Sequence, residues 1–512
     1  MEASDGGYMQ KNITEYWMPK VHDDDVRQMT AIVNADGTKV SFGELFDDAA
    51  SIGTWLIDGI SPNGPVAVFL PKGQEAAASD MGILYAGHFY CNMDIASPAE
   101  RNARILEHIQ PVCVLTTKKL MSKLPETHVQ IVCLEDIVNT EADEEAISHR
   151  LSHVVDTDPL CLINTSGSTG TPKAVALSHR STIDFMDNAI SELSLDGSEV
   201  MGSLSPVYFD IYTLEIWLML AKQAQMVIVP EMYAAFPEKL AAYLEERNIS
   251  FIFWVPTVMV NMANLDILAA HRLTALKKVL FAGEVFPLKH LAYWMEHLPE
   301  TTFINMYGPI EITVDCLYHI MSKKDIEDGS LPIGRPFRNT DVMILDDDRP
   351  CKPGERGELC VRGSSLALGY YRDPEKTSRA FVQNPLNDAY PETIYRTGDI
   401  VWEREDGEIM IAGRKDFQVK HFGYRIELQE IEAVAVRLDF IDNACVLYDH
   451  DKKQIVLVYE AAREINPREI RTELSRLLPK YCLPTQFHQL DEIPRNPNGK
   501  IDRNRLKEML VG

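Results

Sequence analysis

The sequence lacks the marks of a secreted or membrane protein. No run of 18 or more apolar residues occurs, so no segment is suited to span a membrane. The amino terminus, MEASDGGYMQKN, has no basic segment followed by an apolar one, which argues against a secretory signal. The 9 cysteines stand singly, without the paired CxxC spacing of zinc sites or a disulfide framework. We expect a cytoplasmic protein without membrane insertion.

Basic residues are in short supply. The 50 Lys and Arg against 76 Asp and Glu leave a formal net charge of -26. Nucleic acids and anionic membranes attract proteins through positive charge, so a balance of this sign disfavours both. We expect no nucleic-acid partner.

The chain is too long for one hydrophobic core, because 512 residues normally form more than one domain. Short apolar runs alternate with segments of helical period. Strands covered by helices on both faces give continuous apolar runs of this kind. The pattern predicts an α/β fold with largely parallel sheets, and its clearest strand candidates are 65–71, 225–230, 251–256 and 277–283.

The pattern changes near Asp416. Two strand candidates follow, at 444–448 and 455–459, and then a helix with Asn466 as N-cap and Pro467 at its first position. We therefore predict a large N-terminal domain of helix-covered sheets, a hinge, and a small α+β C-terminal domain, with the boundary placed between 1–415 and 416–512.

A glycine- and hydroxyl-rich segment follows the strand candidate LIN. Glycines let the backbone approach an anion, hydroxyl and amide groups donate to phosphate oxygens, and a lysine adds positive charge. Pro172 precedes that lysine and Ala174 follows it, so this is not the Walker pattern of kinases and P-loop ATPases. A loop without function is the simpler alternative, but the length of the run disfavours it. The expected phosphate-binding residues are Thr165, Ser166, Gly167, Ser168, Thr169, Gly170 and Lys173.

The segment TSGSTGTPK resembles the signature of the adenylate-forming superfamily, which includes acyl-CoA synthetases, luciferases and the adenylation domains of nonribosomal peptide synthesis. Other motifs similar to those of the family follow in order along almost the whole chain: YCNMDIASPAER, NMYGPIE, GELCVRG, YRTGD, GRKDFQVKHFGYRIEL and NPNGKIDR. The sequences FAGEVFP and KHFGYRIEL are most similar to those of amino-acid adenylation domains, including the D-alanine:carrier protein ligases.

The resemblance implies ATP and Mg²⁺ as cofactors and a reaction that joins a carboxylate to the α-phosphate of ATP. Such a site must neutralise two anions that approach one another. By resemblance Glu311 ligates Mg²⁺, and Tyr307 stacks on adenine. Asn305 and Gly308 contact the base. Asp399 accepts hydrogen bonds from both ribose hydroxyls, which suits its two acceptor oxygens, and Arg414 supports the nucleotide.

Two further roles come from the same resemblance. Lys500, in NPNGKIDR, bridges the substrate carboxylate and the α-phosphate during adenylation, although a solvated surface lysine is the common alternative. Asp416 is the hinge about which the C-terminal domain reorients for thiol transfer. This chain departs from the family pattern at Ala174, where glycine is usual, and at Ile310, where threonine is usual.

The sequence FDIY points to an amino-acid substrate, because Asp210 matches the aspartate that binds the α-ammonium in such enzymes. A buried carboxylate is favourable only when a cation pairs with it. Carried across by motif, the pocket is mostly aliphatic with a second acid, as in pockets for glycine, alanine, serine or proline. It comprises Asp210, Ile211, Leu214, Thr257, Leu280, Ala282, Met306, Val314, Asp315 and Lys500.

The sequence thus predicts ATP-dependent formation of an aminoacyl-AMP and transfer to a thiol of a separate phosphopantetheinylated carrier protein. Motifs of condensation and carrier domains do not occur in the chain, which favours a stand-alone module. The chemical alternative is an acyl- or aryl-CoA ligase, which has no need of Asp210. A nucleotide-binding regulator is the non-enzymatic alternative, and the presence of Lys500, Glu311 and Asp399 argues against it.

Overall fold

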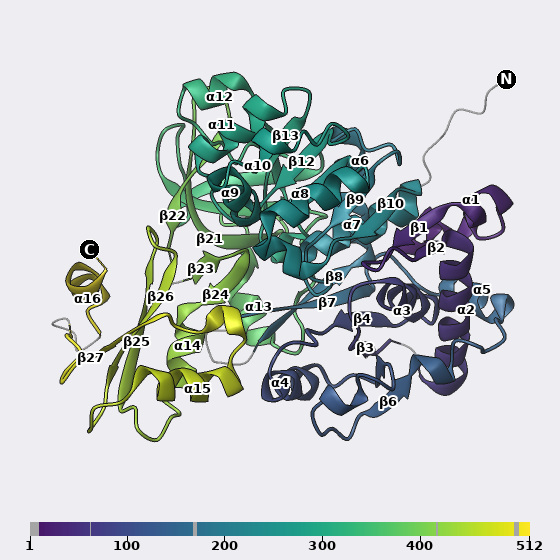
Figure 1. Cartoon of the computed structure of the whole chain (residues 1–512), viewed down its shortest axis with the longest axis horizontal. Helices are drawn as coiled ribbons and strands as arrows, with labels where there is room; N and C mark the ends of the chain where they lie inside the picture. Colours follow the sequence, from purple (N-terminus) through teal and green to yellow (C-terminus); the bar gives the residue numbers. More distant parts are fainter. Residues whose placement is uncertain (1–9, 62, 167–171, 416–417, 496–500, 512) are drawn as a thin grey trace.

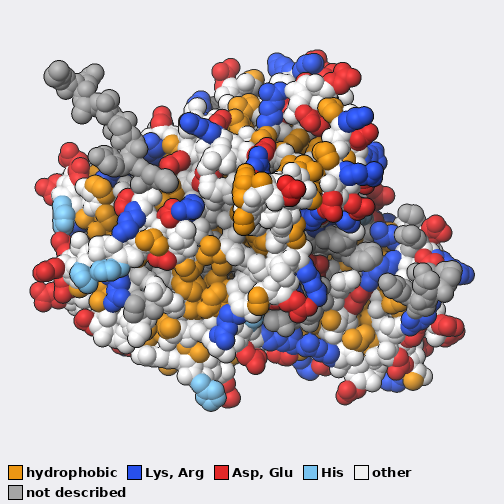
Figure 2. Space-filling view, turned by 180° about the vertical axis from the view of Figure 1, so that it is seen from behind, with side chains coloured by type: hydrophobic (Ala, Val, Ile, Leu, Met, Phe, Trp, Pro, Cys, Tyr) orange, Lys and Arg blue, Asp and Glu red, His pale blue; other side chains and the backbone are white. Residues whose placement is uncertain are grey.

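The computed structural model has a large N-terminal part and a small C-terminal part (Figure 1). It describes residues 10–61, 63–166, 172–415, 418–495 and 501–511. Among these residues no helix is both long and apolar enough to cross a membrane. Acidic and basic side chains are interspersed over the face shown in Figure 2.

The first of two helix-covered sheets has seven strands in the order β19-β8-β7-β4-β3-β5-β6. Neighbours from β7 to β6 are parallel, whereas β8 and β19 run antiparallel to their partners. The 65–71 strand prediction is confirmed, since β3 lies there with every residue buried. The strands are β3 (Pro65–Val68), β4 (Phe89–Asn92), β5 (Cys113–Thr116), β6 (Gln130–Cys133), β7 (Pro159–Thr165), β8 (Lys173–Ser178) and β19 (Gly369–Tyr370).

The second sheet has nine strands in the order β15-β14-β13-β12-β11-β9-β10-β1-β2. The other three strand candidates form β10, β11 and β12, each in a parallel pairing as expected. The strands are β1 (Thr30–Val33), β2 (Lys39–Ser41), β9 (Val200–Ser203), β10 (Gln225–Ile228), β11 (Phe251–Trp254), β12 (Lys278–Phe281), β13 (Thr302–Tyr307), β14 (Leu317–Ile320) and β15 (Arg335–Pro336).

Helices cover these sheets and join them. One hydrophobic core contains side chains of both sheets and of α2, α3, α6 and α7, and residues 211–221 of α7 are all buried. Ser41 and Glu44 form a capping box at the start of α2. The helices are α1 (Asp24–Gln28), α2 (Phe42–Gly59), α3 (Gln74–Tyr85), α4 (Ala99–Ile109), α5 (Glu144–Leu151), α6 (His179–Glu192), α7 (Asp210–Lys222), α8 (Pro237–Glu246), α9 (Pro256–Asn264), α10 (Ile267–Ala270), α11 (Leu288–His297) and α12 (Lys323–Glu327).

A third, antiparallel sheet completes the N-terminal part. Its order is β17-β16-β18-β21-β20, with β22 also paired to β21. The long strand β21 carries Asp399 and ends beside β22, so this sheet brings the YRTGD motif to the domain junction. The elements are β16 (Thr340–Asp346), β17 (Arg349–Pro350), β18 (Gly357–Gly363), α13 (Pro374–Ala380), β20 (Phe381–Gln383), β21 (Thr393–Glu403) and β22 (Ile409–Arg414).

The C-terminal part is the predicted α+β unit with its own core. The two strand candidates form β25 and β26, and α15 begins at Pro467 with Asn466 as its N-cap, so these predictions are confirmed. Alternate side chains of β25 and β26 pack on α14 and α15 or, on the opposite face, on α16. The elements are β23 (Gln418–His421), β24 (Tyr424–Glu427), α14 (Leu428–Ala435), β25 (Asn443–Asp449), β26 (Gln454–Glu460), α15 (Pro467–Leu477), β27 (Gln486–Gln489) and α16 (Arg503–Leu510).

The two parts meet along α4, α15 and the β23–β24 hairpin, while α16 lies at the outer edge of the molecule (Figure 1). The hinge residue Asp416 lies outside the described residues. The boundary at 415 and 416 therefore stays a prediction.

Candidate active site

A cavity opens where strands of both sheets end and the β23–β24 hairpin faces them. Ligands of open α/β sheets characteristically bind beyond the carboxyl ends of the strands. The end of β7 and the next residue supply Ile163 to Ser166, and β11 supplies Phe253. Ala282 and Gly283 follow β12, and the hairpin supplies Lys420, Gly423, Tyr424 and Arg425. The other lining residues are Arg101, Tyr208, Phe209, Asp210, Ile211, Val255, Gly308, Pro309, Ile310, Val314, Asp315, Asp399, Arg414, Gln418 and Tyr481.

The structure brings about half of the predicted substrate residues to this cavity. Asp210, Ile211, Ala282, Val314 and Asp315 line it. The remaining described ones are buried beside it and absent from its lining: Leu214 inside α7, Leu280 in β12, Met306 in β13, and Thr257, which donates a hydrogen bond to Glu284. Their roles as substrate contacts stay predictions.

Asp210 is the first residue of α7 and lines the cavity. The Asp210 Oδ1 atom accepts a hydrogen bond from the backbone N–H of Ile211 at 2.9 Å. Burial raises the pKa of Asp210, and the charge of Lys420 acts in the opposite direction. A carboxylate in this position gains from a cation in the cavity, as expected for an ammonium-binding group.

The predicted nucleotide residues divide into two groups. Asp399 accepts hydrogen bonds from the Tyr307 hydroxyl and, at Oδ1, from Arg414 Nη1, the latter at 2.6 Å. Gly308 lines the cavity, and a Cβ there would lie 2.4 Å from the Cα of Asp315, so only glycine fits. Tyr307 and Asn305 are buried outside the lining, and stacking of Tyr307 on adenine stays a prediction.

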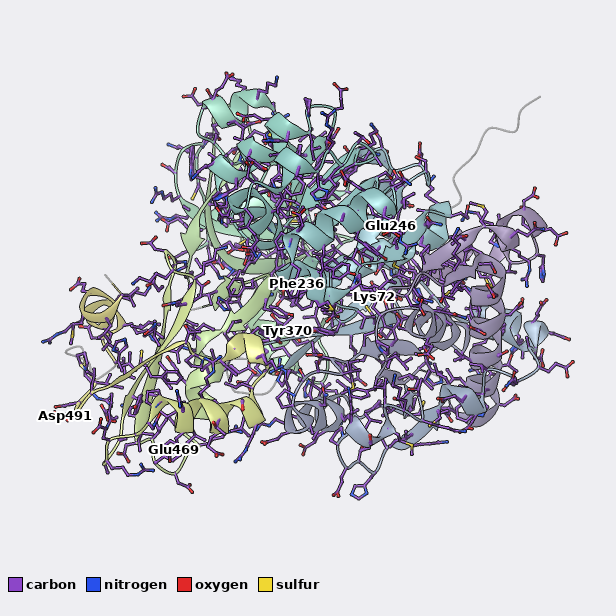
Figure 3. The ribbon with its side chains drawn as sticks, in the orientation of Figure 1. Lys72, Phe236, Glu246, Tyr370, Glu469 and Asp491 are labelled. Carbon is purple, nitrogen blue, oxygen red and sulfur yellow. The ribbon has the colours of Figure 1, made fainter. Side chains whose placement is uncertain are left out.

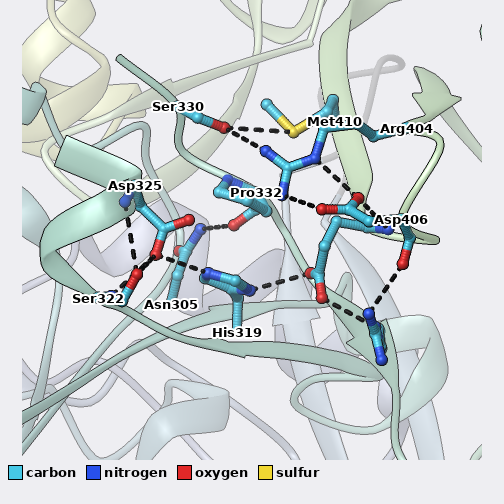
Figure 4. A network of polar contacts seen from close by, with 11 residues as sticks. Asn305, His319, Ser322, Asp325, Ser330, Pro332, Arg404, Asp406 and Met410 are labelled. Carbon is cyan, nitrogen blue, oxygen red and sulfur yellow. Dashed lines mark hydrogen bonds and ion pairs between the residues drawn. The ribbon is translucent and has the colours of Figure 1, made fainter. Parts of the chain in front are cut away.

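The side chain of Asn305 is held by the protein itself. Its Nδ2 donates to the carbonyl of Pro332 at 2.6 Å. Nearby His319 lies between two carboxylates, with Nδ1 2.9 Å from Glu408 and Nε2 3.2 Å from Asp325 (Figure 4). This network fixes the loop that carries Pro332 beside β13, and thereby the wall next to Gly308.

The described part of the phosphate loop binds to the C-terminal part. Ser166 Oγ donates to the carbonyl of Arg425 at 2.6 Å and accepts from the N–H of Glu427 at 3.0 Å. Lys173 Nζ lies 2.9 Å from Glu427 Oε1. Thr165 lines the cavity. The predicted residues Gly167, Ser168, Thr169, Gly170 and Lys500 lie outside the described residues.

Glu311 is fully buried, and both of its oxygens are engaged. Oε2 lies 2.6 Å from Arg425 Nη1, and Oε1 accepts from the Tyr370 hydroxyl at 2.8 Å. Burial alone would raise the pKa of Glu311, but the charge and hydrogen bond of Arg425 lower it to about 2. Tyr370 is labelled near the centre of Figure 3, where β19 approaches the C-terminal part.

This arrangement does not offer Mg²⁺ a free oxygen of Glu311. Within the described ranges, no group of three or more His, Cys, Asp or Glu side chains is placed to hold a metal ion. Glu311 as a Mg²⁺ ligand therefore stays a prediction that requires Arg425 to withdraw.

A second cavity adjoins the first and is rich in cations. The two share Arg414, Gln418 and Arg425, which form the wall between them. Lys173, Arg379, Arg396 and Lys415 also line it, with Glu358 and Glu427 as the acids. The positive lining suits an anion such as a phosphate group.

Sequence reasoning missed the hairpin as part of the site. The GRKDFQVKHFGYRIEL motif was assigned roles only at Arg414 and Asp416, although Lys420 and Arg425 were visible in it as cations. Gly423 has φ 82°, and a Cβ there would lie 2.5 Å from Val255 Cγ1. Glycine therefore allows the hairpin to enter, and the Gly423 N–H donates to Glu284 Oε1 at 2.9 Å.

A buried ion pair links the two parts at the edge of the cavity. Arg101 Nη1 on α4 lies 2.7 Å from Glu430 Oε1 on α14, and the side chains are 9% and 1% exposed. The rings of Tyr424 and Tyr481 stack beside it, with centroids 3.6 Å apart. Neither charge could be assigned a partner from sequence, because the pair spans 329 positions.

Replacing Glu430 by alanine is expected to loosen the junction. The Arg101 guanidinium would remain buried without a partner, for which a penalty of about 3–5 kcal/mol is typical. Hydrogen–deuterium exchange of α4 and α14 should rise well above that of the unaltered protein. The Arg101→Met/Glu430→Leu double variant, which removes both charges, should recover most of the protection. Unchanged exchange in Glu430→Ala would contradict a role for this pair.

Comparison with known proteins identifies the family. A sequence model of the AMP-binding enzyme family matches residues 22–371, and one of the AMP-binding enzyme C-terminal domain matches residues 430–500. The chain belongs to the AMP-binding enzyme family. This confirms the predicted adenylate-forming superfamily and its AMP-forming ligase chemistry.

Curated relatives of this AMP-binding enzyme are peptide synthetases. A dimodular nonribosomal peptide synthase of Bacillus subtilis (strain 168) is 34% identical over 484 residues, which are 92% of this chain and 20% of the relative. Tyrocidine synthase 1 of Brevibacillus parabrevis is 31% identical over 484 residues, which are 92% of this chain and 43% of the relative. The chain thus spans less than half the length of these relatives.

Solved structures agree on the fold. PA1221, an NRPS protein containing adenylation and PCP domains, superposes with a TM-score of 0.80 at 23% identity, covering 98% of this chain and 84% of that one. The o-succinylbenzoate CoA synthetase MenE of Bacillus subtilis gives 0.83 at 19% identity, covering 98% of both. The predicted α/β class, with a large N-terminal and a small C-terminal domain, is confirmed.

Proposed function

We propose that this domain uses ATP to convert a small α-amino acid into its aminoacyl-AMP, and then passes the aminoacyl group to the phosphopantetheine thiol of a carrier protein. The observation that carries the proposal is the partly buried acid Asp210 at the start of α7, which lines the cavity. It offers an α-ammonium a counter-charge.

The aliphatic lining favours a small side chain. Ile211, Ala282 and Val314 are apolar, and Phe253 of β11 adds an aromatic ring to the lining. We therefore retain glycine, alanine, serine and proline as the candidate class. The carrier is proposed because the related PA1221 contains a PCP domain next to its adenylation domain.

ATP-pyrophosphate exchange across a panel of amino and aryl acids tests the proposal. Exchange that depends on a small amino acid, followed by loading of a phosphopantetheinylated carrier supplied as a separate protein, is the expected result. The CoA-ligase alternative predicts exchange with an acid that lacks an amine, and thioester formation with CoA. Exchange with neither class would leave nucleotide binding as the remaining function.

Lys500 is proposed as the catalytic cation of adenylation. Replacing it by alanine should abolish amino-acid-dependent pyrophosphate exchange, since its charge is needed when two anions meet. ATP binding, measured by calorimetry, should be largely intact, and so should transfer from preformed aminoacyl-AMP. Exchange at the rate of the unaltered enzyme would remove Lys500 from the mechanism.

A further inference from the structure

Asp315 is a second acid in the lining of the substrate cavity, and it is more deeply buried than Asp210. It is 3% exposed and lines the cavity beside Val314. Across the described ranges, no hydrogen bond or ion pair to its carboxylate is found. A buried carboxylate without a donor is unfavourable, so its position calls for a partner that enters the cavity.

The backbone before Asp315 is strained in a way that delivers this side chain. Thr313 and Val314 have φ of 59° and 63°, a left-handed region that β-branched residues rarely adopt. Backbone strain of this kind persists only when the surrounding structure imposes it, and it is concentrated at functional sites. Gly308 packs directly against the Asp315 backbone, with space for no side chain of its own.

Two charged groups face Asp315. Burial raises its pKa well above the usual range, the nearby Asp210 raises it further, and Lys420 opposes both. The charge of Asp399 also raises the pKa of Lys420, which belongs to the hairpin of the C-terminal domain. Lys420 is thus shared between Asp315 and Asp399. An amino acid with an aliphatic side chain would bring one cation, its α-ammonium, for Asp210, and would leave Asp315 without a partner.

We infer that the substrate is an α-amino acid whose short side chain ends in a hydrogen-bond donor, a hydroxyl or a second ammonium, and that Asp315 is the residue that selects it. The inference rests on the proposed amino-acid activation. Asp210 would take the α-ammonium and Asp315 the side-chain donor. Phe253 and Ala282 line the same cavity.

Three amino acids of equal size test the inference on the unaltered domain. 2-Aminobutyrate, serine and 2,3-diaminopropionate differ only in ending in CH₃, OH or NH₃⁺. Serine or diaminopropionate should exceed 2-aminobutyrate in kcat/KM for pyrophosphate exchange by about 10- to 100-fold, the usual effect of a hydrogen bond to a charged group. Binding of the matching aminoacyl-sulfamoyl adenosines, measured by calorimetry, should show the same order without catalysis.

Two variants assign the preference to Asp315. In Asp315→Leu the order should reverse, with 2-aminobutyrate preferred. Asp315→Asn is nearly isosteric but uncharged. If the donor is an ammonium, this variant should still activate serine and should no longer activate diaminopropionate. A preference of the unaltered domain for 2-aminobutyrate, or an order that Asp315→Leu does not change, overturns the inference while amino-acid activation stands. Absence of exchange with every amino acid overturns the proposed function as well.

Discussion

Replacing Asp210 by alanine is expected to lower kcat/KM for the preferred amino acid by at least about two orders of magnitude. The substrate ammonium would be desolvated without its counter-charge, and removal of one member of a buried pair typically costs about 3–5 kcal/mol. At about 1.4 kcal/mol per factor of ten, this penalty gives the stated loss. Pyrophosphate exchange with the full amino-acid panel measures it.

The desamino acids serve as the control for this variant. Without an ammonium they gain nothing from Asp210, so their exchange should hold or improve when the carboxylate is removed. Asp210→Asn keeps the size of the side chain, and its loss for amino acids should be nearly as large. If Asp210→Ala leaves the best amino acid unaffected, the amino-acid assignment fails and the CoA-ligase alternative takes its place.

The layers of the fold could be predicted from the sequence because the burial of a strand determines the pattern of apolar residues within it. Continuous apolar runs at β3, β10, β11 and β12 signalled strands covered on both faces. Asn466 and Pro467 marked the start of α15 through capping, which is also a local effect. The motifs placed Asp210, Gly308 and Asp399 around one cavity.

Features that depend on how distant segments meet could not be predicted in this way. The motif assigned Glu311 to a metal, yet its oxygens are engaged by Tyr370 and Arg425, which lie 59 and 114 positions away in the chain. The pocket list included Leu280 and omitted Phe253, although β11 and β12 place them side by side. Which of two neighbouring side chains reaches a cavity depends on packing, and motif spacing does not encode it.

Arg425→Ala should separate the two half-reactions. In the arrangement of this structure, the β23–β24 hairpin occupies the site and Arg425 neutralises Glu311. Without the guanidinium, Glu311 would be a fully buried carboxylate with only the Tyr370 hydroxyl as donor. Loss of such a partner typically costs about 3–5 kcal/mol, which opposes entry of the hairpin. The resemblance implies that the C-terminal domain reorients between adenylation, which uses Lys500, and thiol transfer, and we propose that the arrangement seen here serves thiol transfer.

We therefore expect Arg425→Ala to reduce transfer to the carrier thiol by at least about 100-fold, following the factor of ten per 1.4 kcal/mol, and to change pyrophosphate exchange far less. Single-turnover transfer from preformed aminoacyl-AMP measures the first, and steady-state exchange measures the second. Arg463→Ala is the matched control, because this arginine of the same domain is largely exposed and pairs with Glu469 at the surface. A surface ion pair of that kind contributes little to stability, so Arg463→Ala should retain the rates of both half-reactions. Equal loss of both in Arg425→Ala, in step with a lower thermal midpoint, would reduce Arg425 to a structural residue.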